Sequence, residues 1–142
     1  MFTNTISIHV TELISNSNEI NIICKRPESL TFKVVGIKGA CNGYSISKEE
    51  YFDLPYLKYI STIYISANAD DSGEISLNGQ TVHSYYADQN GSQHSSNYYL
   101  SLNLFKEKDN KVYLRALDRG YGCGYNTNGT SASITLYFTY KD

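Results

Sequence analysis

Several residue types are scarce in this chain of 142 residues, and each scarcity excludes a class of protein. No segment has the roughly 18 consecutive apolar residues of a membrane-spanning helix, so we expect no membrane insertion. Lysine and arginine number 12 against 14 acidic residues and are scattered, which argues against nucleic acid as a partner. The N-terminus lacks a basic start followed by an apolar run, so no secretory signal is predicted. We expect a soluble protein that is cytoplasmic, released or at the cell surface.

Cysteine is scarce too, and Cys24, Cys41 and Cys123 do not have the spacing of a metal site. We expect all three to be reduced, with a disulfide between Cys41 and Cys123 as the alternative. Catalytic motifs are missing: there is no G-x-S-x-G, no H-E-x-x-H and no phosphate-binding glycine loop before a helix. Cys123 has no recognisable base partner either. The sequence therefore predicts a protein that is not an enzyme.

Tyrosine, by contrast, is abundant, with 14 residues beside many serines, threonines, asparagines and isoleucines, whereas tryptophan is absent and only 2 prolines occur. Side chains that are β-branched or aromatic fit the pleated surface of a sheet better than a helix. Apolar and polar residues alternate with the period of a strand in segments separated by polar turns. These segments are 6–10, 20–24, 30–34, 58–66, 74–77, 80–86, 100–104, 112–116 and 134–138.

The residues between these segments predict turns and one helix. Residues 67–73 and 87–97 are polar and typical of connections, and Asn78-Gly79 is a strong signal for a tight hairpin. Ser47 and Glu50 have the spacing of a capping box, which predicts a short helix. The sequence therefore predicts a single domain, residues 1–142, that is an all-β sandwich of about eight antiparallel strands with one short helical turn.

The loop that follows the expected strand 112–116 is the best candidate for ligand contact. It combines four glycines with Asp118, Asn126 and Asn128, whose oxygens are of the kind that Ca²⁺ prefers. Tyr121 and Tyr125 offer aromatic faces that suit the C–H patch of a sugar ring. Glycine and asparagine also favour loops merely because they accept positive φ, so a loop without metal is the alternative.

Three segments in the second half of the chain resemble the galactose-binding-domain-like jelly rolls, a superfamily of sugar-binding modules and adhesins. Residues 67–79 are similar to the family's A-D-D, strand and N-G hairpin. Residues 99–117 are similar to its apolar strand, lysine-bearing turn and second strand. Residues 118–133 are similar to its aspartate, glycine-rich loop and N-x-G-S close. The resemblance implies a jelly-roll sandwich.

Within that superfamily the chain is most similar to small soluble bacterial lectins that bind galactose through a calcium ion. The resemblance implies that Asp118, Asn126 and Asn128 hold calcium and that Tyr44, at the end of the glycine-rich segment 36–43, contacts the sugar. Thr127 separates the two asparagines, which are adjacent in the family pattern.

The expected function is that of a carbohydrate-binding lectin or module without enzymatic activity. Its ligand would be a glycan of galactose type, bound by the loops 36–44 and 118–128. The alternative is a structural or receptor-binding component of a virion, phage tail or surface assembly. A homo-oligomer is expected in both cases, because lectins gain avidity by multivalency and tyrosine-rich sandwich faces suit interfaces.

Overall fold

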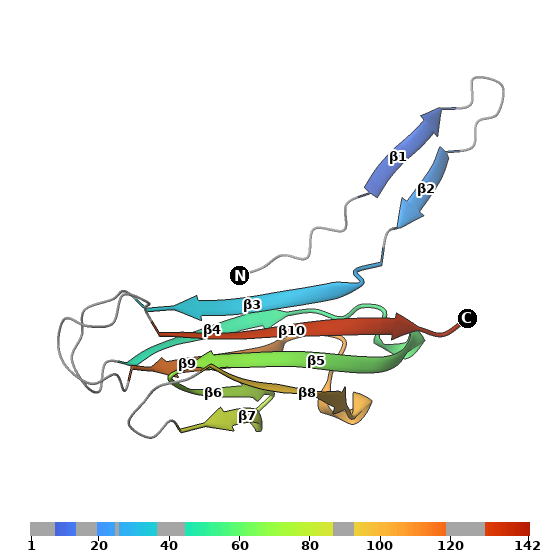
Figure 1. The fold of residues 1–142 in the computed structure, drawn as a ribbon. Helices are drawn as coiled ribbons and strands as arrows, with labels where there is room; N and C mark the ends of the chain where they lie inside the picture. Colours follow the sequence, from blue (N-terminus) through green and yellow to red (C-terminus); the bar gives the residue numbers. More distant parts are fainter. Residues whose placement is uncertain (1–7, 14–19, 25, 37–44, 87–92, 119–129) are drawn as a thin grey trace.

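The computed structural model of the chain describes residues 8–13, 20–24, 26–36, 45–86, 93–118 and 130–142. These residues form ten strands and two short 3-10 turns (Figure 1). The strands are β1 (Ile8–Leu13), β2 (Ile20–Cys24), β3 (Ser29–Val35), β4 (Ser45–Phe52), β5 (Ile60–Asp70), β6 (Ser72–Leu77), β7 (Gln80–Tyr85), β8 (His94–Leu100), β9 (Asn110–Leu117) and β10 (Ser131–Tyr140). The turns are η1 (Leu57–Tyr59) and η2 (Leu102–Leu104).

Eight of the strands form two antiparallel sheets, ordered β3-β10-β5-β8 and β4-β9-β6-β7. Counted from β3, these are strands one, eight, three and six in one sheet and two, seven, four and five in the other. This is the strand order of a jelly roll. The predicted all-β sandwich is therefore confirmed. The remaining strands, β1 and β2, pair antiparallel with each other in a two-stranded sheet apart from the sandwich (Figure 1).

The core lies between the two sheets and follows from the alternation in the sequence. On β5, β9 and β10 every second residue is buried. Isoleucine, leucine and valine supply most of these inward positions, and fully burying such a side chain contributes about 1.5–3 kcal/mol. Phe32 and Phe52 close one side of the core, with ring centroids 5.1 Å apart across the two sheets.

The predicted helix at residues 47–50 is wrong. These residues lie in β4, which pairs with β9 from Ser45–Leu117 to Phe52–Asn110. Pairing along eight residues and the burial of Phe52 outweigh a local capping signal, because tertiary contacts override weak helix propensity.

The strand boundaries differ from the prediction at several places. The expected turn at residues 67–73 is instead the end of β5, where Ala67 and Ala69 are buried, and only Asp71, at φ 64°, separates β5 from β6. Residues 94–97, expected in a polar connection, belong to β8, and the expected strand at residues 100–104 is only the end of β8 followed by η2. The Asn78-Gly79 hairpin is confirmed, with φ of 49° and 85° at its two central residues.

Candidate functional site

Most residues of the site predicted from sequence lie outside the described residues: Tyr44, Tyr121, Tyr125, Asn126 and Asn128. Asp118 is described and lies partly exposed directly after β9.

The described residues that flank the two predicted loops adjoin each other. The backbone N–H of Gly36 donates to the carbonyl oxygen of Thr130 across 2.8 Å, and Ser45 pairs with Leu117. Segments 37–44 and 119–129 therefore start and end at the same end of the sandwich. The ligand site expected from the sequence combines these two loops.

A hollow of about 40 Å³ lies beside Leu117 on the sheet of β6, β7 and β9. Glu74 and Arg115, which are cross-strand partners, line it together with Tyr86, which is well exposed. Within the described part of the chain no three His, Cys, Asp or Glu side chains form a metal-binding group. Calcium at Asp118 thus stays a prediction.

A second surface is more completely described: the outer face of the sheet β3-β10-β5-β8. Tyr64 at the middle of β5 pairs with Tyr99 of β8 on one side and with Tyr137 of β10 on the other. The ring centroid of Tyr64 lies 5.0 Å from that of Tyr99, with the rings edge to face, and 6.4 Å from that of Tyr137, with the rings tilted by 45°. The three rings thus form one row across three strands.

The outer two rings of this row are the exposed ones. Tyr99 is 68% exposed and Tyr137 is 47% exposed, whereas Tyr64 between them is partly buried. Large exposed apolar surface needs a reason in a folded protein, because burying it would be favourable. Two solvent-facing rings that flank a third are a surface suited to contact with a flat, weakly apolar ligand.

Short hydroxyl and amide side chains form a second row beside the tyrosines. Asn97 pairs with Ser66, Ser66 with Thr135, and Thr135 with Thr31. The hydroxyls of Thr31 and Thr135 lie 3.0 Å apart in a hydrogen bond. Among the described residues no group hydrogen-bonds to the side chains of Ser66 and Asn97. This row and the three tyrosines together are called the tyrosine face below.

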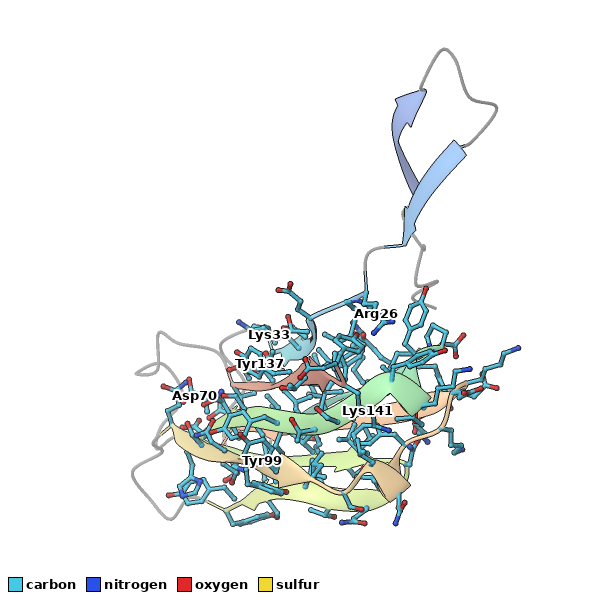
Figure 2. All side chains as sticks on the ribbon, turned by 90° about the vertical axis from the view of Figure 1, so that its right-hand side faces the viewer. Arg26, Lys33, Asp70, Tyr99, Tyr137 and Lys141 are labelled. Atoms are coloured by element: carbon cyan, nitrogen blue, oxygen red, sulfur yellow. The ribbon has the colours of Figure 1, made fainter. Side chains whose placement is uncertain are left out.

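The four strands that carry the tyrosine face contribute few charged side chains to its surface. In the four strands of this sheet only Lys33 and Asp70 among the outward side chains are charged (Figure 2). Both lie at the end where β3 and β5 finish, and Lys33 pairs with Ser133, two rows beyond the tyrosines. The tyrosine face is therefore suited to an uncharged ligand.

The edge where the two sheets meet at β7 and β8 holds a second aromatic group. His83 is buried, and its Nδ1 lies 2.8 Å from the hydroxyl of Ser96. The ring of His94 stacks on that of Tyr85 at 4.1 Å and lies 5.7 Å from that of His83. Burial, and secondly the proximity of His94, hold the pKa of His83 below its usual value. These contacts join the two sheets.

The sequence did not single out Tyr64, Tyr99 or Tyr137 as site residues. The alternation in β5 places Tyr64, Ser66 and Asn68 on one face, and this was the available signal. Which other strands lie beside β5 depends on pairing between distant segments, and the period of a single strand does not contain that information. The same holds for His83 and His94, which the structure brings together from separate strands.

Comparisons with known proteins concern the fold. Scans against protein-family models and against curated proteins return no significant match. The solved structures similar to the chain include a PA14 sugar-binding domain from an RTX adhesin, with 21% identity over 68% of this chain and 50% of that one and a TM-score of 0.39. The subviral particle of infectious bursal disease virus VP2 is 11% identical over 91% of this chain and 37% of that one, with a TM-score of 0.43. This chain thus spans half or less of each structure.

Within the described residues no helix is long and apolar enough to cross a membrane.

Proposed function

We propose that this chain is a carbohydrate-binding domain without enzymatic activity and that the tyrosine face is its binding surface. The observation that carries the proposal is the row of Tyr99, Tyr64 and Tyr137 beside a parallel row of uncharged hydrogen-bonding side chains. A pyranose ring has an apolar C–H patch that packs on an aromatic ring, and hydroxyls that need donors and acceptors. The two rows provide both.

The composition of the face favours a glycan over a protein partner. Protein interfaces are depleted in serine at their centre and enriched in several kinds of large side chain, including methionine and arginine. Here the tyrosines are surrounded by serine, threonine and asparagine, and Val35 is the one exposed large aliphatic side chain in the eight strands of the sandwich. A neutral, hydroxyl-rich partner matches such a surface.

Calcium-dependent binding of a galactose-type sugar at Asp118, Asn126 and Asn128 is a separate, finer proposal. It is supported by the resemblance to lectins and by the adjoining ends of segments 37–44 and 119–129. The two sites differ in one respect that an experiment can use: the tyrosine face has no need of a metal.

The test is a glycan array probed with the wild-type chain, once with calcium and once with a chelator. The variant Tyr99→Ala/Tyr137→Ala should lose the metal-independent signal. Tyr51→Ala is the matched control, because Tyr51 is also 47% exposed but lies on β4 of the other sheet. Wild-type chain that binds no glycan in either buffer, and forms a large assembly by light scattering, would contradict the proposal and support the structural alternative.

A further inference from the structure

We infer that the tyrosine face binds an extended, uncharged polysaccharide chain that crosses strands β8, β5 and β10, rather than a single sugar. This inference rests on the proposed function and specifies its ligand class.

The spacing of the exposed rings sets the minimum length of the ligand. Neighbouring strands lie about 4.8 Å apart, so the two strand spacings between β8 and β10 amount to about 10 Å. Tyr99 and Tyr137 are at the two ends of that span, and each exposes its ring to solvent. One pyranose covers one ring. A ligand that uses both rings is therefore longer than one sugar and has an intervening unit over Tyr64.

The three tyrosines have different roles in this arrangement. Tyr99 and Tyr137 are the stacking surfaces, because their rings are the exposed ones. Tyr64 is a positioning residue: its ring contacts Tyr99 edge to face and lies tilted against Tyr137. Edge-to-face and tilted pairs of aromatic rings are favourable, so Tyr64 restricts both outer rings before ligand arrives. A restricted side chain loses less conformational entropy on binding.

The hydroxyl row fixes the direction of the chain. Asn97, Ser66, Thr135 and Thr31 lie parallel to the tyrosine row, displaced by two residues along each strand, which is about 6.6 Å. Sugars stacked along the tyrosines would present the hydroxyls of one side to this row. The amide of Asn97 offers both donors and acceptors, and Ser66 offers a hydroxyl, for neighbouring sugar units. A polysaccharide that ran along one strand would contact only one tyrosine of the row.

The weak charge of the sheet surface selects against acidic polysaccharides. Lys33 is the one outward basic side chain in the four strands and lies two rows from the tyrosines, and Asp70 lies three rows away. Carboxylated sugars over the tyrosine row would lose hydration without gaining a partner. Binding should also be insensitive to salt, since screening acts on charged contacts.

The experiment is calorimetric titration of the full chain with neutral oligosaccharides of one to six units, in β-1,4-glucose, β-1,4-mannose and α-1,4-glucose series, with oligogalacturonate as the acidic comparison. In at least one neutral series the affinity should rise at least tenfold between one and three units and change little beyond four. Oligogalacturonate should bind at least tenfold more weakly. A tenfold increase in salt should leave the neutral affinities unchanged.

The variants separate this inference from the proposed function. Tyr99→Ala and Tyr137→Ala should each remove most of the gain between one and three units, whereas Tyr51→Ala should keep it. All three variants should stay folded, because the substituted side chains are about half exposed or more, and Tyr51→Ala, which has the same exposed fraction as Tyr137, controls for the loss of stability that truncating a partly buried ring causes. Equal affinity for one and three units, preference for the acidic series, or a length dependence that survives both variants would overturn the inference alone. An array without any bound glycan contradicts the proposed function instead.

Discussion

The side-chain amide of Asn78 donates to the side-chain oxygen of Asn110 across 3.0 Å and joins two turns that are distant in the sequence. The amide nitrogen of Asn78 also donates to the carbonyl oxygen of Leu104. Asn110 is fully buried; its oxygen accepts from the backbone N–H of Lys106, and its nitrogen donates to the carbonyl oxygen of the same residue. One buried amide thus links the start of β9 to Lys106, which follows η2, and to the β6–β7 hairpin.

Replacing Asn110 with alanine should destabilise the fold by about 2–3 kcal/mol, because the backbone groups of Lys106 and the side-chain amide of Asn78 would lose a part-buried hydrogen-bond partner. Urea unfolding followed by circular dichroism measures the change. Asn103→Ala is the matched control, since Asn103 is exposed in η2, and should shift the free energy of unfolding by less than about 0.5 kcal/mol. A similar small shift for Asn110→Ala would contradict the role given to the network.

Sequence reasoning succeeded where structure is local and failed where it depends on distant pairing. The alternation around Ile63 and the Asn78-Gly79 turn predicted β5 and the hairpin, because period and turn chemistry are properties of a few neighbouring residues. The asparagines and aspartates of 67–73 predicted a turn, but β5 continues there because Ala67 and Ala69 fit the narrow space between the sheets. Asn110 lies between the predicted strands 100–104 and 112–116, and nothing local indicates that its amide is buried.

The candidate site also shows the difference between features that the sequence indicates and features that depend on pairing of distant strands. The neighbourhood of segments 37–44 and 119–129 was expected from the resemblance to the lectins, although the strands on either side of each segment lie in different sheets. The row of Tyr64, Tyr99 and Tyr137 was not, because its existence depends on the register of β5 with β8 and β10. A shift of one residue in either register would send a tyrosine to the opposite face.

Gly73→Ala should destabilise the protein by about 1–3 kcal/mol, because two sheets approach closely at this glycine. An added Cβ would lie 2.6 Å from the Cβ of Ala69 and 3.0 Å from the carbonyl oxygen of Arg115. The second substitution Ala69→Gly removes the nearer atom and should restore part of the stability. Thermal unfolding of the single and double variants measures both effects. Equal losses in the two variants would show that the Ala69 contact is not the cause.

Acidification should destabilise the fold through His83. Its pKa in the folded protein is lowered by burial first and by His94 second, and its Nε2 has no hydrogen-bond partner among the described residues. The unfolded chain therefore binds the proton at a higher pH than the folded one, starting near the ordinary histidine pKa of 6.5. Stability is then highest above that pH and falls as the pH drops toward the folded pKa.

The measurement is the free energy of unfolding from about pH 7 to about pH 5, where this histidine changes charge. His83→Leu should flatten the pH dependence relative to wild type. His94→Ala should flatten it less, since the proximity of His94 is the smaller of the two causes. If the free energy of unfolding of wild type, His83→Leu and His94→Ala depends on pH in the same way, protonation of His83, which contacts Ser96 at the β7–β8 edge, is not the cause of the acid destabilisation.

Calcium distinguishes the two proposed sites, which are the loop site at Asp118 and the tyrosine face. If Asp118 helps to hold calcium, the metal should raise the unfolding temperature of the wild-type chain, because a ligand that binds only the folded state stabilises it by mass action. Asp118→Ala should abolish that rise. Asp70→Ala is the control, since Asp70 ends β5 on the outer surface of the other sheet. Binding at the tyrosine face should be the same in both variants, with or without calcium. An unchanged calcium effect in Asp118→Ala would remove this residue from the metal site while leaving the tyrosine face as the place of glycan contact.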